Sequence, residues 1–203
     1  DADGEVTATH EMGDIDLAAA QAAVDEHLLG DIEQIPPMVS AIKIDGKRLH
    51  ELAREGVEVD RPPRPVTIYS FSLMPTGEPD ILLAAVECGS GTYIRTLAAD
   101  LGHLLGGGAH LRNLRRTAVG QFTLGEAAGP DDCELLPVED AVRTLTRVDA
   151  TAQLADLVAN GRVLPAWEGP GPWAVFGPSG PLLAVYERYG STEAKPMVVV
   201  PQS

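Results

Sequence analysis

The segment ILLAAVECGSGTYIRTLAADLGHLL, residues 81–105, decides how the first half of this chain folds. Residues 81–88 are a short apolar run that predicts a strand, and the small residues of 89–91 end it. From residue 92 to residue 105, apolar side chains recur at the spacing of one helix face. The segment therefore predicts a strand, a glycine turn and a helix in succession.

The flanking sequence predicts two further helices and two further strands. Helical spacing of apolar residues covers residues 16–29 and 48–55. Alternation of apolar and polar residues covers residues 66–74, and also the stretch between the pair Pro36-Pro37 and a turn at Asp45-Gly46. Helices and strands are thus mixed along the chain, which predicts the α+β class.

The composition of the chain changes near residue 148. Residues 151–160 predict one more helix, and the remainder is rich in glycine and proline with the short strand candidates WAVF, LLAVYE and MVVV. We therefore expect two domains, residues 1–148 and residues 149–203, of which the second is small and β-rich.

Length and composition exclude several classes of protein. A chain of 203 residues with 44% hydrophobic content can bury a core, and its apolar runs stay far below the roughly 20 residues of a membrane span. Two cysteines, Cys88 and Cys133, are too few for a disulfide framework and fit a reducing cytoplasm. Beside the glycines of the turn, Cys88 is interpreted as a buried strand residue, because its surroundings suggest no histidine partner.

The balance of charge bears on possible partners. A net charge of -15 argues against indiscriminate binding of nucleic acid, because a polyanion is repelled at long range. Any contact with RNA must therefore be local. The cations do form two groups, Lys43, Lys47, Arg48 and Arg54 in the first and Arg95, Arg112, Arg115 and Arg116 in the second.

The first residues of the sequence resemble neither a signal peptide nor a translation start. They contain no methionine, no basic region and no apolar core. We expect the chain to be a fragment or a processed product of a longer protein.

The glycine turn and the helix after it are the best candidate site. Small residues at 89–91 let a substrate approach the backbone closely, and the free N–H groups at the helix start favour an anion. Arg95 lies in the first helical turn, where the helix dipole disfavours a cation unless an anion answers it. It is a candidate partner for a carboxylate or a phosphate; an ordinary surface arginine is the alternative.

Two long motifs carry a resemblance to a known family. Residues 34–56 contain QIPP, SAIK, GK and ELAREG, and residues 90–102 contain SGTYIRTL and DLG. In this order they resemble the hallmark motifs of TruB-type pseudouridine synthases. DGEV at residues 3–6 and LRRT, VG and Phe at residues 114–122 are also similar, so the likeness covers residue 1 to about residue 126. The tail resembles, less closely, the small PUA-type RNA-binding module.

The resemblance implies an activity and a fold. The implied enzyme isomerises the T-loop uridine of tRNA at position 55, flipping the base into a pocket before an aspartate attacks it. The implied fold has a mixed, mainly antiparallel sheet with flanking helices. No cofactor and no metal is implied, and scattered histidines indicate no metal site. The implied partner is the T-arm of tRNA. The resemblance implies that the protein is a monomer and does not bind a membrane.

The resemblance also implies roles for individual residues. Arg95 would pair with the nucleophilic carboxylate and hold it ionised. Tyr93 would line the pocket of the flipped base, and Leu114 would pack beside the base or, as the alternative, belong to the core. The residues implied to contact phosphates are Lys43, Arg112, Arg115 and Arg116.

The sequence departs from the family pattern in three ways. The family's nucleophile lies in a Gly-His-x-Gly-Thr-Leu-Asp stretch, followed by a pocket tyrosine, and neither occurs in these 203 residues. Asp100 is no substitute, because it lies nearly two turns after Arg95 in an amphipathic helix. Val39 and His50 stand where the family often has tyrosine. We therefore expect the chain alone to be inactive, since the covalent step needs the absent carboxylate.

Two other functions remain open from the sequence. A noncatalytic module that binds or helps to fold tRNA would use the same contact residues without the nucleophile. An acidic α/β enzyme acting on a small phosphorylated metabolite would use the turn at residues 89–91.

Overall fold

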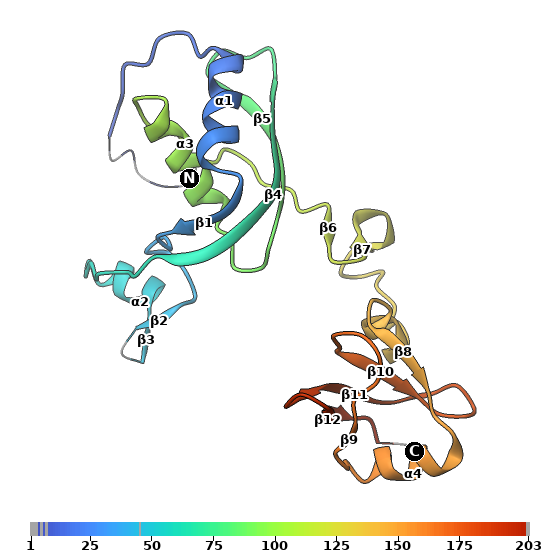
Figure 1. Ribbon diagram of the computed structural model, residues 1–203. Helices are drawn as coiled ribbons and strands as arrows, with labels where there is room; N and C mark the ends of the chain where they lie inside the picture. Colours follow the sequence, from blue (N-terminus) through green and yellow to red (C-terminus); the bar gives the residue numbers. More distant parts are fainter. Residues whose placement is uncertain (1–3, 5, 7, 45, 202–203) are drawn as a thin grey trace. The chain divides into compact units, whose positions relative to one another are not determined.

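The computed structural model describes residues 4, 6, 8–44 and 46–201, and it divides into two compact units, Asp1–Arg115 and Arg116–Ser203 (Figure 1). Each unit has a hydrophobic core of its own. The candidate site predicted from the sequence lies in the first unit.

The first unit is built on a three-stranded antiparallel sheet. Its strands are β1 (Gly30–Gln34), β4 (Arg64–Pro75) and β5 (Leu82–Cys88), in the order β1-β4-β5. The long central strand β4 is buried at Val66 and Ile68 and then at Phe71 and Leu73. This change from even to odd positions coincides with a register shift between Ile68 and Ser70, because an inserted residue turns all later side chains to the other face.

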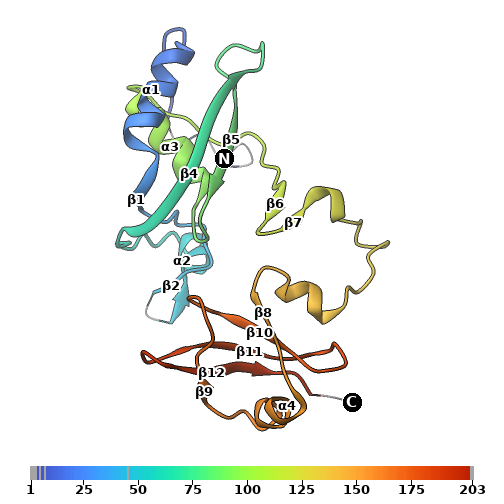
Figure 2. The same cartoon turned by 45° about the vertical axis from the view of Figure 1, so that its right-hand side comes forward.

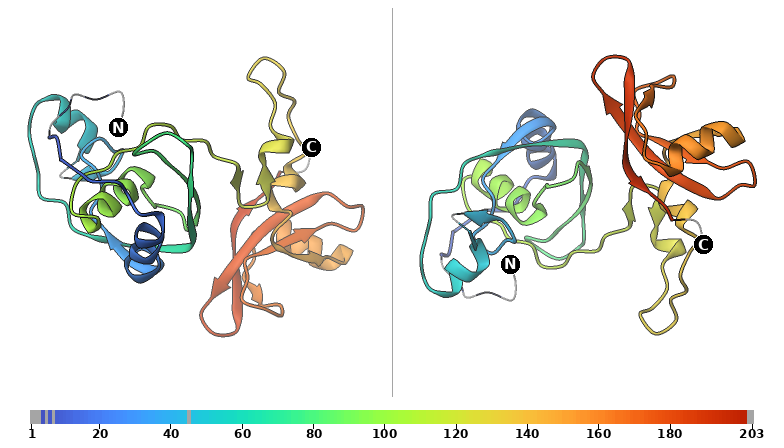
Figure 3. Two further views of the ribbon diagram at one scale, coloured as in Figure 1. Left: turned by 90° about the horizontal axis from the view of Figure 1, so that it is seen from above. Right: turned by 90° about the horizontal axis from the view of Figure 1, so that it is seen from below.

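Two helices, α1 (Leu17–His27) and α3 (Ile94–Leu104), share the core with one face of this sheet (Figures 2 and 3). The Asp16 side chain caps α1 by accepting a hydrogen bond of 2.9 Å from the Ala18 N–H. The buried residues of the core come from both helices and from β4: Ala20, Val24, Leu28, Val66, Ile68, Phe71, Leu73, Leu97 and Leu101.

A small basic hairpin and a short helix lie between β1 and β4. The hairpin consists of β2 (Lys43–Ile44) and β3 (Lys47–Arg48), and α2 (Leu49–Arg54) follows it directly. Leu49 and Leu52 are the buried residues of α2. The cations of the hairpin, Lys43, Lys47 and Arg48, are exposed.

The second unit contains a five-stranded sheet in the order β8-β10-β11-β12-β9, in which β8 and β10 are parallel and the other pairs antiparallel. Its elements are β6 (Ala118–Val119), β7 (Phe122–Thr123), η1 (Leu124–Glu126), η2 (Val138–Val142), β8 (Thr146–Asp149), α4 (Ala152–Ala159), β9 (Leu164–Pro165), β10 (Trp173–Phe176), β11 (Leu182–Tyr189) and β12 (Glu193–Val199).

Both faces of this sheet are covered. Trp173 and Val175 of β10 face a core that includes Val158 of α4, whereas Ala174 and Phe176 face a core that includes Val142 of η2. A strand buried on both faces reads as an unbroken apolar run, which explains why WAVF and LLAVY lack alternation.

The predicted fold class is confirmed, since helices combine with mainly antiparallel sheets and the C-terminal unit is β-rich. The stretch after Pro36-Pro37 was expected to be a strand; of it, only the two-residue β2 pairs with a neighbour. The expected boundary at residue 148 falls inside β8, so the five-stranded sheet begins slightly earlier. The assignment of residues 1–148 and 149–203 to separate functions stays a prediction.

Within the described ranges, the structure contains no helix that is both long and apolar enough to span a membrane.

Candidate active site

A hollow of about 460 Å³ opens at the start of α3, beside the ends of β1 and β4. This volume lies within the range of about 300–1,000 Å³ typical of small-molecule sites. The residues that line the hollow are Ile42, Arg64, Pro65, Val66, Ser90, Gly91 and Tyr93. The predicted glycine turn and the predicted pocket tyrosine therefore lie on the same hollow.

The turn at residues 89–91 brings the chain from β5 into α3. Gly91 has a φ of +87°, a left-handed conformation that favours glycine. The Thr92 hydroxyl donates a hydrogen bond of 2.9 Å to the Gly89 carbonyl oxygen and closes the turn. Tyr93 then stands as the extended N-cap residue of α3 and lines the hollow, with its side chain half-buried.

The backbone of Tyr93 is held by the side chain of Gln34, the last residue of β1. The Gln34 Oε1 accepts a hydrogen bond of 3.0 Å from the Tyr93 N–H, and its Nε2 donates one of 3.3 Å to the Tyr93 carbonyl oxygen. Gln34 is only 1% exposed and is one of the two buried polar residues among those described. Gln34 belongs to the QIPP motif, but no role was predicted for it. The sequence feature that could have indicated one is a polar residue directly before Ile35-Pro36-Pro37.

Arg95 lies two residues further, in the first turn of α3, and is half-buried. Its Nη2 donates a hydrogen bond of 2.8 Å to the carbonyl oxygen of Val39. The guanidinium therefore links α3 to the segment that precedes the basic hairpin. A cation in the first turn of a helix opposes the helix dipole, so a nearby anion would stabilise it.

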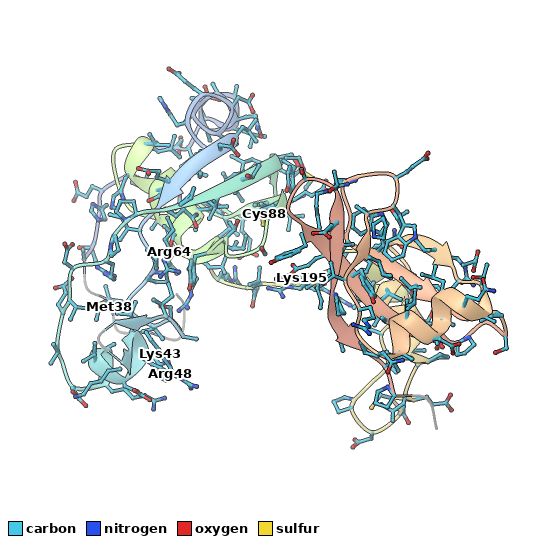
Figure 4. All side chains as sticks on the ribbon, turned by 60° about the horizontal axis from the view of Figure 1, so that its bottom comes forward. Met38, Lys43, Arg48, Arg64, Cys88 and Lys195 are labelled. Carbon is cyan, nitrogen blue, oxygen red and sulfur yellow. The ribbon has the colours of Figure 1, made fainter. Side chains whose placement is uncertain are left out.

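Lys43 lies on the basic hairpin directly opposite Arg48 (Figure 4). Cross-strand partners point to the same face of a ladder, and like charges so placed repel each other. In the part of the chain that the structure describes, neither cation has an acidic partner, whereas Lys47 forms a 3.4 Å ion pair with Glu55. Arg64, at the start of β4, adds a further exposed cation on the wall of the hollow.

The remaining predicted residues are not brought into the hollow. Arg112 forms a 3.0 Å ion pair with Glu78. Arg115 and Arg116 are exposed and are the residues at which the two compact units divide. Leu114 is 61% exposed and belongs to none of the buried clusters of the described residues.

Asp100 does not line the hollow that Tyr93 lines. It lines a second hollow of about 400 Å³ with residues of α1, β1 and α3, among them His27, Glu33 and His103. Burial raises the pKa of Asp100, and the nearby His103 opposes this in part. Val39 is 56% exposed, and His50 Nδ1 lies 3.0 Å from the Ser40 carbonyl oxygen.

Cys88 is half-buried at the end of β5 and packs against the core of the first unit. Over residues 8–44 and 46–201, no three histidine, cysteine or carboxylate side chains lie close enough together to hold a metal ion.

Three family models match the chain and together cover nearly all of it. Residues 1–94 match the N-terminal domain of the TruB family of pseudouridylate synthases. Residues 95–159 match the C-terminal domain of tRNA pseudouridylate synthase B. Residues 145–201 match the C-terminal model of tRNA pseudouridine synthase II.

Curated relatives described as tRNA pseudouridine synthase B are similar over most of the chain. The Aromatoleum aromaticum protein is 47% identical over 82% of this chain and 56% of its own length. The Geobacillus thermodenitrificans protein is 38% identical over 99% of this chain and 72% of its own length. The Streptomyces coelicolor protein is 43% identical over 93% of this chain and 68% of its own length. The chain thus spans between about half and three quarters of these relatives.

Solved structures agree in fold. A Cbf5-Nop10-Gar1 complex gives a TM-score of 0.68 at 23% identity, covering 95% of this chain and 63% of the other. An H/ACA RNP bound to a substrate RNA gives 0.65 at 20% identity, covering 95% and 64%. With relatives at 38% and 43% identity that it spans over more than two thirds of their length, this chain belongs to the TruB family of pseudouridylate synthases.

Proposed function

We propose that this chain is the larger part of a tRNA pseudouridine synthase that isomerises the T-loop uridine at position 55. The observation that carries the proposal is the Ser90–Arg95 turn, which places a tyrosine in a hollow and an arginine in the first turn of the adjoining helix. The family relatives are described as tRNA pseudouridine synthase B, which supports tRNA as the substrate.

The hollow beside α3 receives the flipped uracil. Enzymes that act on a base inside a folded nucleic acid extrude it into a pocket and stack it on aromatic or apolar side chains. Tyr93 provides the aromatic wall of this pocket, and Leu114, which is exposed and therefore available, packs beside the base.

Arg95 pairs with the nucleophilic aspartate, which is supplied by a segment outside these 203 residues. A guanidinium holds a carboxylate in a planar, charge-assisted pair and keeps it ionised. On this proposal the 203 residues alone bind tRNA but do not catalyse the reaction, and no cofactor or metal takes part.

Local cations bind the phosphates of the T-arm despite the net charge of -15. Lys43 is the best placed, because it stands opposite Arg48 and, among the described residues, no acid is paired with either cation. Further phosphates are bound by Arg112, Arg115 and Arg116. Arg112 must first break its ion pair with Glu78 to bind a phosphate. Residues 1–148 form the catalytic portion, and residues 149–203 form a small RNA-binding domain.

The test compares three proteins: the chain as given, the chain restored with its upstream coding sequence, and the restored chain with Arg95→Ala. Turnover is followed as tritium released from tRNA labelled at C5 of uridine, because the isomer joins ribose through that carbon. Activity is expected only in the restored chain. Arg95→Ala should lower kcat on the order of 100-fold or more, since a misplaced reacting group costs about that much.

Binding of tRNA by the same three proteins separates the alternatives. Inactivity of the restored chain with tRNA still bound would overturn the proposal in favour of a noncatalytic tRNA-binding or folding module. Absence of both activity and tRNA binding would instead favour an enzyme acting on a small phosphorylated metabolite. The Arg95→Lys variant of the restored chain keeps the charge without the planar fork, so it should recover only part of the lost activity.

A further inference from the structure

We infer that Gln34 is a positioning residue for the reaction, because its amide holds the backbone N–H and carbonyl oxygen of Tyr93, the pocket tyrosine at which the helix that carries Arg95 begins. The inference rests on the proposed function and assigns a role in it to a residue that does not line the hollow. Gln34 acts through Tyr93 and Arg95 and touches neither the base nor the nucleophile.

The geometry requires an amide at this position. Tyr93 presents one N–H and one carbonyl oxygen toward β1, and Gln34 answers the first with Oε1 at 3.0 Å and the second with Nε2 at 3.3 Å. A carboxylate has no hydrogen to donate, and an apolar side chain satisfies neither group. The two hydrogen bonds of the Gln34 amide thus connect the end of β1 to the turn that leads into α3.

The held peptide is the point at which α3 begins. The Tyr93 carbonyl oxygen also accepts hydrogen bonds from Thr96 N at 3.0 Å and Leu97 N at 3.1 Å, which close the first helical turn. Arg95 lies inside that turn. A displacement of the Tyr93 peptide therefore moves the pocket wall and the guanidinium together.

Packing alone does not account for Gln34. At a position that is only 1% exposed, at the end of a strand, methionine or leucine would fill the space equally well and would need no hydrogen-bond partners. The amide lies where the turn has two backbone groups that need hydrogen-bond partners, beside residues that line the hollow.

The same unit contains a matched control. Gln21 of α1 holds the backbone of β4 in the same manner: its Oε1 accepts from Leu73 N at 2.9 Å, and its Nε2 donates to the Phe71 carbonyl oxygen at 3.0 Å. Among the described residues, the side chain of Gln21 forms hydrogen bonds with Asp25, Phe71 and Leu73, and none of these lines the hollow. Gln21→Met therefore removes an equivalent pair of hydrogen bonds to backbone, together with one of 2.8 Å to the Asp25 carboxylate, without disturbing the start of α3.

The experiment measures kcat and KM for tRNA, and the melting temperature, of the restored protein and its Gln34→Met and Gln21→Met variants. Both variants should melt below the parent. Gln34→Met should lower kcat on the order of 10- to 100-fold with KM for tRNA unchanged, because the lost interaction positions groups that act after binding. Gln21→Met should leave kcat at the parent value.

Gln34→Glu provides a second test if Gln34→Met does not fold, because it keeps the shape and the acceptor; when ionised it loses the donor and adds a buried negative charge. A lowered kcat at unchanged KM again supports the role. A kcat equal to that of the parent in the folded Gln34 variant, or an equal loss in Gln21→Met, would overturn it. An inactive parent would instead count against the proposed function, so the two failures are distinguishable.

Discussion

The guanidinium of Arg95 and the carbonyl oxygen of Val39 are joined by a hydrogen bond of 2.8 Å between residues 56 positions apart in the sequence. The bond ties the first turn of α3 to the segment that leads into the basic hairpin. Ser40, the next residue of that segment, accepts from His50 N at 3.1 Å, and Arg61 donates to Pro36 O at 3.2 Å. The segment is thus held by hydrogen bonds to its own carbonyl oxygens, and the bond from Arg95 connects it to α3.

Removing this contact should loosen the hairpin segment. In Arg95→Ala we expect faster backbone hydrogen exchange over residues 38–50 and unchanged exchange in β4, because only the former lose a tether. Exchange measured by mass spectrometry checks this on the chain as given. Arg54→Ala, which removes an exposed arginine at the end of α2, serves as the control and should leave both regions unchanged. Equal exchange in Arg95→Ala and the parent would contradict the tether.

Leu114 and Leu97 should separate function from stability. Leu114 is 61% exposed, so Leu114→Ala should change the free energy of unfolding by less than about 0.5 kcal/mol. Leu97 is 1% exposed in the core of the first unit, and Leu97→Ala should cost about 2–5 kcal/mol. Turnover of tRNA by the restored protein should nevertheless fall in Leu114→Ala, because the side chain packs beside the flipped base. Denaturant unfolding and tritium release measure the two effects, and a large loss of stability in Leu114→Ala would refute the assignment.

The long, strongly patterned elements of the fold could be predicted from the sequence. The helix expected within residues 16–29 and the strand, turn and helix of residues 81–105 are present as expected. The strands β1 and β8 were missed, because GDIEQ and TRVD are short and mostly polar. What makes them strands is pairing with distant partners, β4 and β10, and pairing of that kind leaves no local pattern.

The candidate site could be predicted only in part. Tyr93 lies on the hollow as expected, since strand, turn and helix follow one another directly in the sequence. Gln34 and Arg64 precede Tyr93 by 59 and 29 positions in the sequence. The antiparallel pairing of β1 with β4 brings them together near it. Their roles depend on a register that the local sequence does not encode, and motif reasoning accordingly assigned them none.

The opposed pair Lys43 and Arg48 should dominate the salt dependence of tRNA binding. Each cation that contacts a phosphate releases counterions, so the double change to glutamine should lower the slope of log Kd against log salt concentration by about 2. Lys47→Gln should change the slope less, because Lys47 is already paired with Glu55 at 3.4 Å. Filter binding over a range of salt concentrations measures the slopes. Equal slopes for the parent and the double variant would show that the hairpin does not contact phosphates.

Arg143 and Glu126 hold the β6–β7 hairpin to η2 in the second unit. Arg143 Nη1 donates to Glu126 Oε1 at 2.8 Å, and the guanidinium also stacks on Phe122 at 4.2 Å. The hydrogen bond from Arg143, followed by those from the Thr123 N–H and hydroxyl, lowers the pKa of Glu126 to about 2. The carboxylate therefore stays ionised, and the contact intact, over most of the acidic range.

Acid should break this contact within a defined interval. A carboxyl whose pKa is lower in the folded than in the unfolded state stabilises the fold above its ordinary value of 4.5. That stabilisation is lost as the pH falls toward about 2. The melting temperature of the parent should therefore exceed that of Glu126→Gln at neutral pH, and the difference should shrink only below pH 4.5. Comparing the two proteins at each pH cancels the titration of all other carboxyls. A difference that is independent of pH would show that the charge of Glu126 does not hold the hairpin.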